Sequence, residues 1–76
     1  MTISAKITNR TDITVYVMGY PLAPGKSNDF PFVMEKIPMV SSVGYVILDE
    51  RGSYDSNSKL RIVKNENFNN YFIMVK

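Results

Sequence analysis

Apolar and polar residues alternate with a period of two along much of this chain. In residues 2–8, apolar side chains at the odd positions alternate with Thr, Ser and Lys, and residues 13–20 repeat the pattern. Because successive side chains of a strand point to opposite faces, this alternation is typical of β-strands that bury one face. No segment shows a persuasive helical period of 3.6, so the pattern predicts an all-β fold.

Six segments are expected to form strands, and residues that favour turns separate them. They are residues 2–8, 13–20, 30–34, 43–48, 59–64 and 71–75. The first two are predicted to form a hairpin, Pro24-Gly25 predicts a type II turn, and the polar run 49–58 is predicted to be a loop. Six strands joined by connections of about four to ten residues predict a single domain over residues 1–76, a small antiparallel β-sandwich or partly open barrel.

Departures from simple alternation predict where individual strands lie. Residues 43–48 and 71–75 are apolar on both faces, as expected of central strands covered on both sides. Pro31 has no N–H to donate to a neighbouring strand. Residues 30–34 are therefore expected to form an edge strand or an irregular crossing segment, with a short helical turn in residues 33–37 as a further alternative.

The 76 residues include no cysteine and no histidine. This absence excludes disulfides, the usual zinc sites, and the usual general base and thiol nucleophile at neutral pH. Two carboxylates can hydrolyse a glycoside, but the adjacent Asp49 and Glu50 would point to opposite faces of a strand. Asp55 adds no spacing typical of a calcium loop. We therefore predict a protein that is not an enzyme and holds no metal or cofactor.

No apolar run reaches the roughly 20 residues that cross a membrane as a helix. Residues 13–23 imitate a signal sequence in part, but Asp12 precedes them, Pro21 breaks them and Pro24 follows. The sequence therefore predicts a cytoplasmic protein with no membrane partner. The tripeptide Asn9-Arg10-Thr11 fits the N-glycosylation pattern and is interpreted as a chance match.

The chain has more apolar strand faces than so short a domain is expected to bury. Tyr16, Met18 and Tyr20 occupy the face of residues 13–20 that should be polar in an isolated hairpin. Because tyrosine and methionine combine apolar area with adaptability, these three residues are the predicted site for another protein or a second copy of the chain. A tightly closed barrel is the alternative. Such a module would be an accessory factor, an inhibitor or an assembly component, and its size suits a phage or mobile-element product.

A second hypothesis is that the chain binds nucleic acid. The net charge is only +2, but residues 59–76 hold four basic residues against the single acidic residue Glu66. Small β-barrels bind single strands through a basic groove and exposed aromatic rings. The candidate residues are Lys59, Arg61, Lys64 and Tyr71. This hypothesis ranks second, because the basic residues equally fit an ordinary solvated face and the aromatic residues a core.

Overall fold

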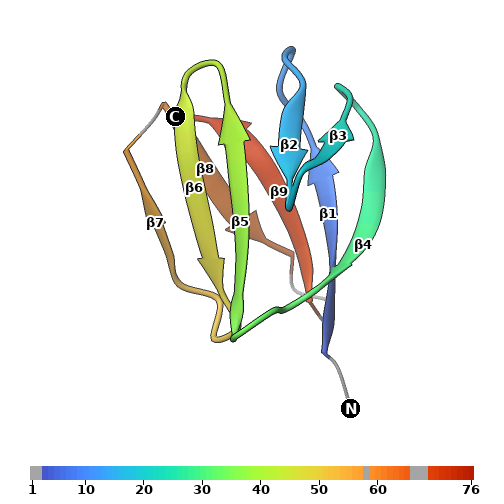
Figure 1. Cartoon of the computed structure of the whole chain (residues 1–76). Helices are drawn as coiled ribbons and strands as arrows, with labels where there is room; N and C mark the ends of the chain where they lie inside the picture. Colours follow the sequence, from blue (N-terminus) through green and yellow to red (C-terminus); the bar gives the residue numbers. More distant parts are fainter. Residues whose placement is uncertain (1–2, 58, 66–68) are drawn as a thin grey trace.

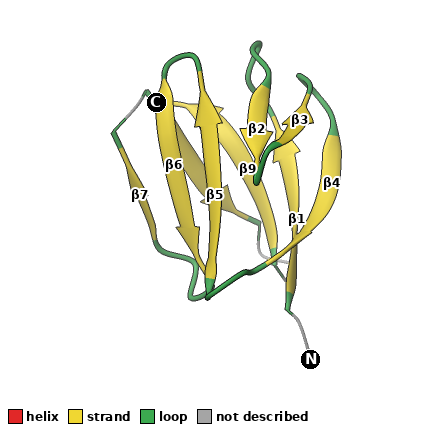
Figure 2. Cartoon of the chain, viewed as in Figure 1, coloured by secondary structure: helices red, strands yellow, loops and turns green. Residues whose placement is uncertain are grey.

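The described part of the chain folds into nine strands in two sheets and contains no helix (Figures 1 and 2). The computed structural model describes residues 3–57, 59–65 and 69–76. The strands are β1 (Ser4–Asn9), β2 (Val15–Val17), β3 (Tyr20–Leu22), β4 (Ser27–Pro31), β5 (Lys36–Ser41), β6 (Gly44–Asp49), β7 (Tyr54–Ser56), β8 (Leu60–Lys64) and β9 (Asn70–Val75). The predicted all-β fold is thus confirmed.

The two sheets stack to form a small β-sandwich. One has four strands in the order β4-β1-β9-β8, and the other has five in the order β3-β2-β5-β6-β7. In Figure 1, β5 and β6 lie in front of β8 and β9. Neighbouring strands are antiparallel except β1 and β9, which run parallel with Ile7 opposite Tyr71.

The core lies between the sheets and takes alternate residues from each strand. In β1, Ala5 and Ile7 are fully buried, whereas Lys6 between them is exposed. In β6, Val46 and Leu48 are fully buried in the same way. Burying side chains of this size contributes about 1.5–3 kcal/mol each. A register slip of one residue would turn this apolar set toward water, so the alternation itself fixes the pairing.

Asn9 is the polar residue that closes one end of the core. Its amide nitrogen donates to the carbonyl oxygens of Ile13 and Leu22, both at 2.8 Å. Its side-chain oxygen accepts from the backbone N–H and the hydroxyl of Thr11, at 2.9 and 2.6 Å. This fully buried side chain therefore ties β1 to the hairpin of β2 and β3. The amide of the glycosylation tripeptide is turned away from solvent.

Prolines protect one edge of each sheet. β4 borders the four-stranded sheet, and the N–H of Phe32 just after it donates to the oxygen of Ile3 at 3.0 Å. Along a strand, successive N–H groups point alternately toward and away from the neighbouring strand. The nitrogen of Pro31 therefore faces away from β1. Pro21 has the equivalent place in β3, at an edge of the other sheet. Missing N–H groups discourage pairing with another chain. The predicted edge position of Pro31 is confirmed, but the edge strand spans Ser27–Pro31 and not residues 30–34.

Parts of the predicted layout are wrong. β1 and β2 do not form a hairpin, because β1 pairs with β4 and β9 while β2 pairs with β3 and β5. The predicted strand 13–20 is divided by a tight turn into β2 and β3. Residues 33–37 hold a two-residue turn and the start of β5 instead of a helical turn, and the predicted loop 49–58 contains β7. β6 and β9 are interior strands as predicted, but each buries one face only.

Candidate functional site

Three exposed apolar side chains lie side by side on the outer face of the five-stranded sheet. Tyr16 of β2 is opposite Val40 of β5, and Val40 is opposite Tyr45 of β6. Their exposed fractions are 50%, 56% and 40%. Cross-strand neighbours have Cβ atoms about 5 Å apart, so the three form a continuous row. Pro21 of β3 lies opposite Tyr16 and extends the row to the sheet edge.

An open groove of about 560 Å³ lies on the same sheet. It is lined by Met18, Val33, Met34, Lys36, Pro38 and Ile47. Pro38 and Ile47 are cross-strand neighbours, one step along β5 and β6 from Val40 and Tyr45. The row and the groove are therefore contiguous. We name as the apolar face Tyr16, Met18, Met34, Val40, Tyr45 and Ile47. Contiguous exposed apolar side chains are a usual mark of an interaction site.

Two methionines that line the groove lie in tight turns whose positive φ angles are unfavourable for methionine. Met18-Gly19 joins β2 to β3 with φ of 52° and 84°, and Met34-Glu35 precedes β5 with φ of 53° and 67°. Positive φ at both central residues suits the twist of paired strands, but Asn-Gly is the preferred sequence there. Left-handed backbone costs about 1–2 kcal/mol for each residue with a Cβ. Met34 is 90% exposed, so burial of its side chain does not offset this strain.

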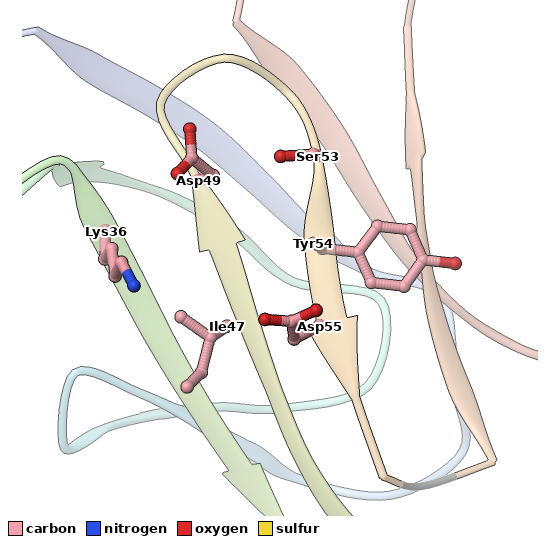
Figure 3. Close-up of a pocket in the computed structure, with 6 residues that line it drawn as sticks. All are labelled: Lys36, Ile47, Asp49, Ser53, Tyr54 and Asp55. Carbon is pink, nitrogen blue, oxygen red and sulfur yellow. The ribbon is translucent and has the colours of Figure 1, made fainter.

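Charged residues surround a shallow pocket of about 90 Å³ beside the groove (Figure 3). Lys36 and Asp55 point to the same side of the sheet there, whereas Tyr54 points away. Asp49 accepts hydrogen bonds from the backbone N–H of Arg51 at 2.8 Å and from its Nε at 3.2 Å. The backbone bond first, and then the guanidinium, hold the pKa of Asp49 below its ordinary value. The pocket is smaller than the few hundred Å³ typical of organic ligand sites.

The outer face of the four-stranded sheet carries charged side chains as well as the apolar Val63, Phe72 and Met74. Lys6 of β1 and Arg61 of β8 are exposed on it. Phe72 of β9 also points outward, but the guanidinium carbon of Arg10 lies 4.0 Å from the centroid of its ring. Arg10 therefore covers the aromatic surface that this sheet would otherwise present to solvent.

Two of the three predicted protein-binding residues lie on the apolar face. Tyr16 belongs to the row and Met18 to the groove. Tyr20 is opposite the fully buried Val17, so it points toward the other sheet. There its ring meets Phe30 edge-on with the centroids 5.9 Å apart. In an unbroken strand Tyr16 and Tyr20 would share a face, but the two turn residues between β2 and β3 change this relation.

The predicted nucleic-acid residues are divided among two faces and the core. Lys59 and Arg61 project from the outer face of the four-stranded sheet. Lys64 is opposite Tyr71 and therefore shares the inward side, where it remains exposed at the end of β8. Tyr71 is 1% exposed, and its hydroxyl has no hydrogen-bond partner among the described residues. Burial raises the pKa of this phenol, and a ring so enclosed is not free to stack on a base.

Val40, Tyr45 and Met34 were not among the predicted binding residues. Pro38 concealed the strand that carries Val40, although Ile37 and Met39 flank this proline with the spacing of an inward face. That spacing is the signal that would have found β5. For Met34 there was none, because nothing in its neighbours predicts a left-handed turn.

Comparison with known proteins adds no family to this geometry, since no family model, curated protein or solved structure matches the chain. Within residues 3–57, 59–65 and 69–76, no three acidic side chains gather as a metal site would need. The same residues form no helix that could span a membrane. Function is therefore argued from the site alone.

Proposed function

We propose that this chain is a non-catalytic, cytoplasmic module that binds another protein through the apolar face, as an accessory factor, an inhibitor or an assembly component. The observation that carries this proposal is the row of exposed side chains of Tyr16, Val40 and Tyr45 beside the methionine-lined groove. Aromatic residues and methionine are enriched at the centres of protein interfaces. None of the three row residues belongs to the core, so folding alone does not explain them.

Backbone strain in the two turns supports the same proposal. Asn in place of Met18, and Asn-Gly in place of Met34-Glu35, would suit the positive φ angles of these turns better. Strained backbone of this kind persists where the side chain it presents has a use. Methionine is flexible and polarizable, which suits it to a binding groove. Both methionines line the same groove, but Met18 also packs against the core, so backbone strain supports the proposal mainly at the exposed Met34.

Charge around the apolar face favours a partner with basic residues at its rim. Residues 33–57 hold four acidic residues and two basic ones. One of each, Asp49 and Arg51, pair with each other at 3.2 Å, which leaves three carboxylates against Lys36. A second copy packed face to face would bring a like-charged rim, and such juxtaposition disfavours a complex. The proposed occupant is therefore a different protein, with apolar anchors flanked by Lys or Arg.

The test places a charge at the centre of the apolar face. Immobilised wild-type protein captures partners from a lysate of the producing cells, and calorimetry then measures binding of the purified partner. Val40→Asp is expected to weaken that binding by about 30-fold or more, as for a central interface residue. Val63→Asp is the matched control, because Val63 lies on the outer face of the other sheet. It should change partner binding by less than about threefold.

Each other outcome contradicts the proposal. A wild-type bait that retains nothing beyond what Val40→Asp retains would show that the apolar face binds no protein. Equal losses in the two variants would place the contact elsewhere. Light scattering tests whether the occupant is a second copy of the chain. If the wild type is a dimer and Val40→Asp is a monomer, the apolar face binds a second copy and not a different protein.

A further inference from the structure

Charge is distributed very unevenly between the two sheets. Residues 3–10, 26–32, 59–65 and 69–76, which hold the four-stranded sheet, contain seven basic residues and one acidic residue, Asp29. The segment 33–57 of the other sheet has an excess of acidic residues, as described above. A net charge of +2 for the whole chain conceals this difference. Clustered basic residues on one face are the electrostatic footprint of a site for polyanions.

Four exposed basic side chains gather at one end of this sheet. They are Arg10, Lys59, Arg61 and Lys76, which we call the basic patch. The N–H of Lys76 donates to the oxygen of Lys59 at 2.7 Å, so these two lysines are directly opposite each other. Arg61 follows on the same face of β8, opposite Met74. Within the described residues, none of the four forms an ion pair with a carboxylate.

The lysine pair is unfavourable for the isolated domain. Like charges directly opposite on neighbouring strands repel each other and destabilise the pairing. An anion placed between them removes this repulsion. A phosphodiester backbone supplies such anions at regular intervals, and each contact releases condensed counterions.

Arg10 adds a surface on which a base could stack, which a polyanion without bases would not use. Its guanidinium carbon lies 4.0 Å from the centroid of the Phe72 ring, and its backbone N–H donates to the carbonyl oxygen of Ile73 at 2.9 Å. Arg10 is exposed, so the guanidinium offers its outer side to solvent. Unpaired bases stack on guanidinium planes as well as on aromatic rings. Duplex DNA and lipid headgroups have no free base with which to use this platform.

We propose that the basic patch binds single-stranded nucleic acid, with phosphates at Lys59, Lys76 and Arg61 and a base stacked on Arg10. This site lies on the sheet opposite the apolar face and does not depend on protein binding there. Lys59 and Arg61 were already candidates in the sequence-based hypothesis. Arg10 and Lys76 take the place of Lys64 and Tyr71.

The test is the salt dependence of binding to a fluorescein-labelled oligothymidylate of about 20 nucleotides, measured by anisotropy. Three phosphate contacts predict a slope of about −2.1 for log K against log salt, so affinity should fall about 18-fold between 50 and 200 mM salt. Lys59→Ala/Arg61→Ala leaves one contact and should reduce this fall to about 2.6-fold. The control Lys36→Ala/Lys64→Ala removes the same charge away from the patch and should keep the wild-type slope.

Arg10→Lys separates stacking from charge. It keeps the cation and removes the guanidinium plane, so we expect an unchanged slope and an affinity about tenfold lower. A duplex of equal length and vesicles that contain phosphatidylserine are the competing ligands, and both should bind more weakly than the single strand. The proposal is overturned if wild-type binding lacks the salt slope, if the control pair loses as much as the patch pair, if Arg10→Lys binds normally, or if duplex or vesicles bind equally well.

Discussion

The two outer faces of this sandwich follow the same period of two but carry very different side chains. On the five-stranded sheet, the apolar side chains of Tyr16, Val40 and Tyr45 are 50%, 56% and 40% exposed. On the four-stranded sheet, Phe72 lies under Arg10, with Thr8 and Val63 opposite it on the neighbouring strands. Each sheet needs only its inner face for the core, so folding does not require this difference. In the proposals above, the outer faces reflect what the chain binds, whereas the inner faces reflect how it folds.

The largest expected effect separates two tyrosines of one hairpin. Tyr16 and Tyr20 are 50% and 51% exposed but point to opposite sides of the sheet. Tyr16→Ala should weaken partner binding by about 30-fold, as for an aromatic residue at an interface centre. Tyr20→Ala should leave binding within about threefold and instead lower the free energy of unfolding by about 1 kcal/mol, through its lost contact with Phe30. Calorimetry and urea unfolding measure the two effects. Equal binding losses would erase the distinction between the faces.

The next effect tests whether the strained turn serves binding. Replacing Met34-Glu35 by Asn-Gly should raise the free energy of unfolding by about 1–2 kcal/mol, because these residues tolerate positive φ. Partner binding should weaken about tenfold, because a methionine of the groove is lost. Met34→Ala/Glu35→Ala is the control that removes the side chains and keeps the strain. It should lose binding without gaining stability in urea unfolding. A stabilised Asn-Gly variant with full binding would contradict a functional role for Met34.

A smaller effect is expected on the outer face of the four-stranded sheet. Arg10→Ala uncovers Phe72 and removes the cation–π contact, so the free energy of unfolding should fall by about 0.5–1 kcal/mol. Partner binding should not change, because Arg10 lies on the other sheet. Urea unfolding and calorimetry on the same samples check both statements. Loss of partner binding would show that the two faces are not independent.

The smallest effect concerns Tyr71, which belongs to neither face. Its pKa in the folded chain is raised by burial, so its contribution to stability is present below the unfolded pKa and is lost as pH rises through the folded one. Tyr71→Phe should therefore reduce the fall in unfolding free energy above about pH 10. Urea unfolding between neutral and alkaline pH measures the difference. Identical alkaline profiles would contradict this account of Tyr71.

Fold class and core were predictable because alternation specifies which side chains are buried. Ala5, Ile7, Leu60 and Ile62 are all buried where the period of two placed them. Strand partners were not predictable in the same way. The parallel pairing of β1 with β9 joins the two ends of the chain, and no local pattern encodes such a contact. Pro38 hid β5, because a proline has no N–H to donate within a sheet, although its oxygen still accepts from the N–H of Met18 just after β2.

The candidate site was predictable in part. Tyr16 and Met18 were found because they break the polar face of an alternating strand. Tyr20 was misplaced because Met18-Gly19 gives little sign of a hairpin turn, in contrast to Asn-Gly. The rest of the apolar face joins residues that only the pairing of β2, β5 and β6 brings together. Its recognition therefore required the strand order.

The most direct test of the central claim compares two tyrosines as crosslinking positions in the producing cells. Tyr45 lies on the apolar face, whereas Tyr54 is opposite the buried Leu48 and points away from that face, and their exposed fractions are 40% and 36%. A photoreactive phenylalanine is placed at one position or the other, and the crosslinked products are identified by mass spectrometry. We predict one specific protein adduct from position 45 and none from position 54. Adducts from position 54 alone, or the same adducts from both positions, would contradict the claim that the apolar face binds the partner.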